Sequence, residues 1–137
     1  MNGQKALQAE KDLVQVGASS SSREVLQRLR EHGHIDDMMD GYRLAIAVAI
    51  GFGREPRSGE KGERKTMFAV GNLDPDSSIR EAIKEINSDY RAVPARAAED
   101  LAEQGLEIIS DSFQGENFSF TDMLDRVSKA NISASGS

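Results

Sequence analysis

The seven residues from Leu44 to Ile50, LAIAVAI, contain no charged or polar side chain. A helix built from them has no face that water can solvate, so it must be buried against other helices or against another copy of the chain. They lie near the end of a unit that runs from Ser22 to Gly53. The pattern of this unit predicts an amphipathic helix, a glycine turn and a more apolar second helix. This unit favours assembly more than catalysis.

The length of 137 residues fits one domain with a single core. The apolar run is much shorter than the ~20 residues that span a bilayer. The absence of cysteine excludes disulfides, thiolate zinc sites and iron–sulfur clusters, and the first residues lack the pattern of a secretory signal. We therefore expect a bacterial cytoplasmic protein without a cofactor.

The first helix of the unit should be capped by Ser21 or Ser22 and end near Gly33, where a left-handed residue costs least. The second should be capped by Asp36 or Asp37, because a carboxylate suits the positive end of a helix dipole.

The remaining elements follow from shorter patterns. A brief strand or extended arm is expected at 13–16, and a strand or extended segment at 65–73. A third helix should start at 74–76 with Pro75 in its first turn, and a fourth should occupy 90–110. Inside it, Gly105 indicates either close packing or a helix end. A last helix is expected after a cap at Ser119 or Thr121.

The predicted fold class is mainly α, a compact bundle of about five helices with a short extended arm or strand segments. The domain organisation is a polar lead-in at 1–12, a single helical domain at 13–130 that contains a basic flexible loop at 54–65, and a disordered tail at 131–137.

The charge distribution bears on nucleic acid binding. A net charge of −6 argues against a protein that coats nucleic acid, because that affinity comes from Lys and Arg meeting phosphates. The loop at 54–65 nevertheless carries more basic than acidic residues, and clustered cations on a loop can contact a DNA backbone. The predicted DNA-binding residues are Arg54, Arg57, Lys61, Arg64 and Lys65.

Two groups could be taken for metal sites. His32 and His34 lie near Asp36 and Asp37, but no third ligand is preorganised beside them. The segment 74–78 has alternating oxygens but lacks the glycine and the distant glutamate of a calcium loop. We expect the two histidines to be solvent exposed or to bond the helix-end carbonyls, and we expect helix capping at 74–78. We predict no metal site and find no catalytic signature.

Four segments together indicate a family. EVLQRLREHG, GYRLAIAVAIGFG, KTMFAVGNLD and RAAEDLAEQGLEIISD occur in an order that resembles the DndE-like small proteins and related Dnd-system-associated proteins. These accompany bacterial DNA phosphorothioate modification and related phage-defence systems. The resemblance covers roughly residues 12–112.

This resemblance implies a non-enzymatic, mainly helical accessory subunit that forms a homo-oligomer or docks onto a protein partner in a DNA-modification or antiviral defence complex. It also implies DNA contact through basic residues, to which the first helix would add Arg23, Arg28 and Arg30. The chain departs from the family in its acidic charge and in an extra amphipathic helix at 118–130. The expected oligomer or partner interface consists of Leu44, Ile46, Val48, Ile50, Met123, Leu124 and Val127.

Two alternatives remain open. The order of arm and two helices also resembles a ribbon-helix-helix regulator, in which paired arms from two chains enter the major groove. The arm at 13–17 has one Gln and no charge for reading bases. The other alternative is a small metal-dependent nuclease built on Asp36, Asp37 and Asp40.

Overall fold

The computed structural model describes residues 11–57, 62–86, 88–113 and 125. The predicted mainly helical fold is confirmed. The described elements are β1 (Gln15–Ala18), α2 (Ser20–Glu31), α3 (Met38–Gly51), β2 (Lys65–Ala69), α4 (Val70–Leu73), α5 (Ser78–Ile86), the 3-10 turn η1 (Ser88–Tyr90) and α6 (Pro94–Ser112).

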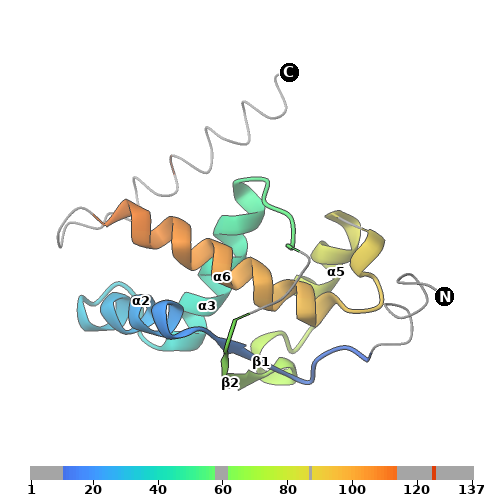
Figure 1. The fold of residues 1–137 in the computed structure, drawn as a ribbon, viewed down its shortest axis with the longest axis horizontal. Helices are drawn as coiled ribbons and strands as arrows, with labels where there is room; N and C mark the ends of the chain where they lie inside the picture. Colours follow the sequence, from blue (N-terminus) through green and yellow to red (C-terminus); the bar gives the residue numbers. More distant parts are fainter. Residues whose placement is uncertain (1–10, 58–61, 87, 114–124, 126–137) are drawn as a thin grey trace.

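Helix α6 organises the molecule. It crosses α3, and α2, α5 and β1 also pack against it (Figure 1). Its buried side chains include Leu101, Leu106 and Ile109, which join one core with residues from α2 and α3. The chain therefore folds around its last described helix, and the apolar segment at 44–50 is covered largely by α6.

The first two helices lie close to their predicted places. The cap of α2 is Ser19, whose side chain accepts from the Ser22 amide, so the helix begins before the expected cap at Ser21 or Ser22. Asp37 caps α3 as expected. Gly33 adopts a φ of 77° directly after α2, which confirms the glycine turn.

The two strands form one antiparallel sheet within the chain. Gln15 pairs with Ala69 and Ala18 pairs with Lys65, with an irregularity between Val16 and Gly17. The expected extended segment at 65–73 is only partly right, because the chain turns into the short helix α4 after Ala69. The α4 turn brings Leu73 into the core.

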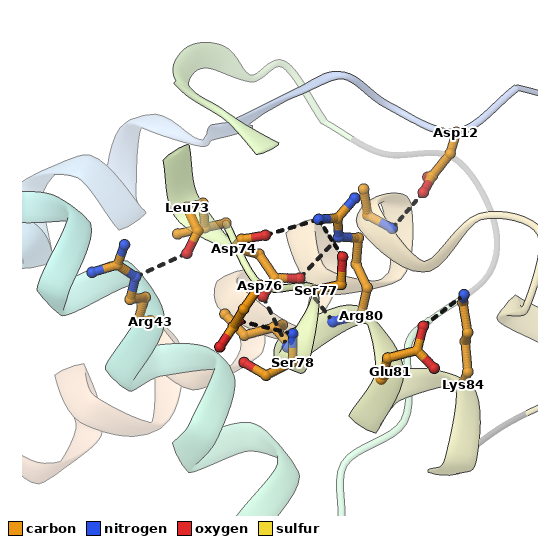
Figure 2. A network of polar contacts seen from close by, with 12 residues as sticks. Asp12, Arg43, Leu73, Asp74, Asp76, Ser77, Ser78, Arg80, Glu81 and Lys84 are labelled. Atoms are coloured by element: carbon orange, nitrogen blue, oxygen red, sulfur yellow. Dashed lines mark hydrogen bonds and ion pairs between the residues drawn. The ribbon is translucent and has the colours of Figure 1, made fainter. Parts of the chain in front are cut away.

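The third helix begins later than predicted. Asp74 accepts hydrogen bonds from the amides of Ile79 and Arg80 at 3.0 Å each, and from the Arg80 Nε at 2.9 Å (Figure 2). Ser77 takes a φ of 63°, so the chain reverses before the helix starts. Pro75 consequently lies outside α5 and not in its first turn. The capping interpretation of Asp74 is confirmed.

The described part of the lead-in contributes Asp12 to the fold. Asp12 accepts from the amides of Ala95 and Arg96 at 2.8 and 2.9 Å, and these are among the first-turn amides of α6. Pro94 occupies the first turn beside them, where its missing N–H costs nothing. A residue assigned to the polar lead-in therefore caps the central helix, across more than 80 positions of sequence.

Gly105 lies inside α6 where that helix meets α3. A β-carbon built at this position would collide with the backbone of Ala45, its carbonyl oxygen above all. Of the two interpretations that the sequence allowed, close helix packing is correct, since α6 continues to Ser112. The missing side chain lets the two helix backbones approach each other.

Part of the predicted interface is buried inside this chain. Ile46 and Val48 are each 2% exposed because α3 packs on α6, so these two side chains cannot reach a partner and their assignment was wrong. Leu44 and Ile50 are half-buried at the edge of the same core. The last predicted helix with Met123, Leu124 and Val127 and the tail at 131–137 lie outside the described residues.

We expect Gly105→Ala to destabilise the protein by about 1–3 kcal/mol or more, because the added methyl group forces α3 and α6 apart. Chemical denaturation followed by circular dichroism measures this. Gly71→Ala is the control, since a β-carbon there meets open space. Equal stability of the two variants would contradict the close contact.

Candidate nucleic-acid interface

Among the residues predicted to bind DNA, Arg57 is held against α6. Its amide donates to Asp100 Oδ2 at 2.7 Å, and its Nη2 lies 3.3 Å from Asp100 Oδ1. Its Nη1 lies 3.5 Å from Glu107 Oε2. The guanidinium is half-exposed, but two carboxylates already neutralise it. Arg57 is therefore better explained as an anchor for the loop than as a DNA contact.

Asp100 is the buried partner in this anchor. Burial alone would raise the pKa of its carboxyl group, but hydrogen bonds from the Arg57 amide, from Gln104 and from the Arg57 side chain outweigh burial and lower the pKa. Gln104 Nε2 donates to Asp100 at 2.9 Å and to the Glu55 carbonyl at 2.7 Å. The side chains of α6 thus fix the first half of the loop.

The other basic residues of the loop differ in their surroundings. Arg64 Nη1 lies 3.4 Å from Glu99 Oε1, and the Arg64 side chain is 15% exposed. Arg54 and Lys65 are exposed. Lys61 lies outside the described residues. The predicted cluster is therefore divided, and two of its described members, Arg64 and Lys65, line one cavity together.

This cavity, of about 330 Å³, lies between the start of α2 and the start of β2. Its lining residues are Ser20, Arg23, Glu63, Arg64 and Lys65. Among the described residues, three cations and one carboxylate therefore line it. We call this group the basic cavity.

The strand register places Lys65 beside α2. Lys65 pairs with Ala18, and a single residue, Ser19, separates Ala18 from the first turn of the helix. At Gly17 a β-carbon would collide with the Lys65 carbonyl oxygen, so this close approach requires glycine. The backbone of the sheet thus brings the loop cations to the positive end of a helix.

Two carboxylates of α6 hold this junction. Glu103 accepts from the Ser19 amide at 2.9 Å and from the Ser19 hydroxyl at 2.8 Å. Glu99 accepts from the Gly17 amide at 2.8 Å. These three bonds tie the end of β1 and the residue before α2 to α6, so the rim of the basic cavity is attached to the central helix.

The three arginines of α2 have different environments. Arg23 Nε donates to the Ser19 carbonyl at 3.4 Å and the side chain lines the basic cavity. Arg28 lies 4.3 Å above the ring of Phe113. Arg30 is exposed near the other end of the helix. Only Arg23 therefore joins the loop cations.

The candidate metal ligands are used in other ways. Asp37 accepts from the Asp40 amide at 3.0 Å, and Asp40 lies 3.5 Å from Arg43. The rings of His32 and His34 are 6.4 Å apart. Within the described ranges, no group of three or more His, Asp or Glu side chains could hold a metal ion. These contacts fit the capping interpretation of Asp37.

The pairing of β1 bears on the ribbon-helix-helix alternative. That arrangement pairs the arms of two chains, whereas β1 already pairs with β2 of its own chain. Its amide at Gly17 is also occupied by Glu99. The arm is therefore part of an internal sheet in this protein.

No protein-family model, curated protein or solved structure matches this chain. The resemblance to the DndE-like proteins accordingly stays a prediction. Among the helices described, none is both long and apolar enough to cross a membrane.

The sequence did not predict that Ser20 and Arg23 would line one cavity with Arg64 and Lys65. The two pairs belong to segments far apart in the chain, and no local pattern shows that these segments meet. One signal could have indicated it. An extended arm joined to a serine-rich helix start must pair with some other strand, and the segment after the basic loop was the other strand expected.

We expect Asp100→Asn to cost about 1–3 kcal/mol at pH 7, since it removes the charge that Arg57 and its amide face. Because the folded pKa is lowered, this stabilisation is complete above the unfolded value of about 3.9 and is lost as the pH falls through the folded value. Urea unfolding at pH 7 and near pH 3 should show a smaller difference at the lower pH.

The control is Asp111→Asn, an exposed position on the same helix, which should change stability by no more than about 0.5 kcal/mol. An Asp100→Asn cost that is the same at both pH values would argue against the ionised Asp100 as the source of the stabilisation.

Proposed function

We propose that this protein is a non-enzymatic accessory subunit of a bacterial DNA-modification or phage-defence complex, and that it contacts the DNA backbone through the basic cavity. The observation that carries the DNA contact is the meeting of Arg23, Arg64 and Lys65 around one cavity at the start of α2. The assignment to a defence complex rests on the family resemblance alone.

Backbone contact is the chemistry that suits this arrangement. Lys and Arg side chains and helix N-termini are the usual partners of phosphate oxygens, and such contacts position a protein on DNA without reading its sequence. The basic cavity offers all three types of group. The described lining residues include no aromatic side chain on which unpaired bases could stack, so a duplex backbone is the better ligand.

In a mobility-shift assay with duplex DNA at low salt, we expect Arg23→Gln with Lys65→Gln to bind more weakly than the unmodified protein. Each lost phosphate contact should also reduce the slope of log affinity against log salt by about 1. The matched control is Arg30→Gln with Arg91→Gln, which removes the same charge from exposed positions outside the cavity lining.

Equal weakening by both double variants would mean that overall charge, and not the basic cavity, governs binding. No shift at any salt concentration would leave only docking onto a protein partner.

Self-association is the second part of the proposal. Its support is that large apolar side chains still reach the surface: Val14 is 80% exposed and Ile86 is 45% exposed. Leu44 and Ile50, which were predicted for the interface, keep partial exposure on α3. Apolar surface of this kind gains stability when a second copy covers it.

Multi-angle light scattering should give a mass that is a multiple of the 14.9 kDa chain at micromolar concentration. The expected fraction of oligomer rises with protein concentration, because association follows mass action. A clean monomer over that range would contradict self-association and would leave the DNA contact to be judged by its own assay.

A further inference from the structure

Helix α3 has one face that the rest of the described chain leaves open. Its other faces pack mainly on α6 and α2, and its core residues lie there. Since each residue turns an α-helix by about 100°, the positions between the buried ones fall on one stripe. This stripe, which we call the α3 outer face, consists of residues that are exposed or half-buried: Asp40, Arg43, Leu44, Ala47, Ile50 and Gly51.

The centre of the α3 outer face is apolar. Ala47 is exposed there, and Leu44 and Ile50, each half-buried, lie three residues before and after it. Helix axes approach each other most closely where the side chains in contact are small, so a second helix can lie over Ala47 between the two larger side chains. Covering this centre removes apolar surface from water, which stabilises the covered state.

The two ends of the α3 outer face carry opposite charges. Asp40 lies in the first turn, with its side chain 49% exposed, and the exposed Arg54 follows the last turn. The Arg54 amide donates to the Ala49 carbonyl at 2.9 Å, and Gly53 before it takes a φ of 73°. The chain therefore folds back onto the end of the helix, which holds Arg54 at that end.

Both charges remain available to a partner. Arg43 lies 3.5 Å from Asp40, but this contact joins two exposed groups and contributes little. The Arg43 Nε and Nη2 donate instead to the carbonyls of Leu73 and Asn72. Arg54 takes part in none of the ion pairs among the described residues.

The acidic residue next to Arg54 follows a different path. Glu55 is also exposed, but Gln104 of α6 binds its carbonyl at 2.7 Å, so the chain turns toward α6 directly after Arg54. The basic end of the α3 outer face is therefore set by Arg54.

A second copy of the α3 outer face is complementary to the first. Leu44 and Ile50 are placed symmetrically about Ala47, and so are Asp40 and Arg54, seven residues before and after it. Two antiparallel copies with Ala47 on the two-fold axis would bring Leu44 to the same height as the partner's Ile50. Asp40 would likewise lie at the height of the partner's Arg54. A parallel pair would place like charges together, so the charges favour the antiparallel pair.

We propose that two copies of this chain pair through the α3 outer face in this antiparallel arrangement. The proposal rests on the self-association in the proposed function and assigns its surface and symmetry. The 14 residues of α3 span about 21 Å, and one helix face of that length buries less than the ~800 Å² per partner of a standard interface. The dimer should therefore be weak and should dissociate on dilution.

Cross-linking through an introduced thiol tests the two-fold axis. The sequence contains no cysteine, so Ala47→Cys supplies a single thiol per chain. Disulfides form where the two Cα atoms are about 4.4–6.8 Å apart, which the axis at Ala47 permits. We expect mild oxidation to give a covalent dimer at least roughly tenfold faster for Ala47→Cys than for Ala92→Cys, because a paired thiol has a high effective concentration. Ala92 is the matched control, an exposed alanine in the turn before α6.

A charge on the axis should separate the two copies. Ala47→Glu places two like charges in contact, so light scattering should show less dimer than for the unmodified protein at the same concentration. Ala92→Glu adds the same charge elsewhere and should leave the dimer unchanged. Glutamate is a good helix former, so Ala47→Glu should remain folded, and circular dichroism checks this.

Charge reversal tests the orientation of the pair. Arg54→Glu should weaken the dimer by roughly two- to fivefold for each of the two ion pairs that it removes. Asp40→Arg together with Arg54→Glu restores opposite charges at each end and should recover the affinity. Failure of this double variant to recover it would contradict the antiparallel orientation.

The remaining outcomes separate this surface from self-association in general. Faster cross-linking at position 47 together with loss of dimer in Ala47→Glu supports the proposal. Oligomers that survive Ala47→Glu, without faster cross-linking, would overturn the α3 outer face and leave self-association standing. A monomer at every concentration would contradict both. If the thiol of a monomeric Ala47→Cys also reacts slowly with a maleimide, another part of the chain covers this face.

Discussion

The contact between α3 and α6 is the constraint on which the other elements depend. Gly105 allows α6 to lie on the backbone of α3 at Ala45. The same approach buries Tyr42, whose hydroxyl donates to the Gly17 carbonyl at 2.9 Å and so ties β1 to the helix pair. A side chain at position 105 would therefore disturb the sheet as well as the helices, because Tyr42 and Gly17 follow the position of α3.

Once α6 is buried on most sides, its polar residues must find partners inside the protein. Asp100 and Glu103 are 2% and 6% exposed, and each accepts from backbone amides of a distant segment. A buried carboxylate without such donors would be strongly destabilising. The acidic residues of α6 therefore act as attachment points for the loop and for the β1–α2 junction, and these attachments decide which cations remain for a ligand.

The elements that could be predicted from sequence are those set by local contacts. The cap at Asp37, the turn at Gly33 and the helical periodicity of α2 and α3 depend on neighbours within a few residues. The late start of α5 could not be predicted, because it depends on how Asp74 folds back on Ile79 and Arg80.

Contacts between distant residues were beyond sequence reasoning for a similar reason. The Asp12 cap and the Arg57–Asp100 bond join residues 83 and 43 positions apart. Nothing in their local pattern distinguishes Arg57, which is anchored to Asp100, from Lys65, which lines the basic cavity. The candidate site was therefore predicted as a basic loop, whereas its geometry comes from strand register.

The net charge of −6 does not by itself decide whether an anion can bind at this site. Salt screens exposed charges beyond about 10 Å at 0.1 M, so the balance near the basic cavity is set by Arg23, Arg64 and Lys65 against Glu63, Glu99 and Glu103. These three cations are few beside the six to ten phosphate contacts typical of strong duplex binding. Affinity for DNA would then have to come from several copies or from partner proteins that add contacts, since linked sites bind far more tightly than one. A few backbone contacts of this kind fit the proposed accessory role better than the role of an independent DNA-binding protein.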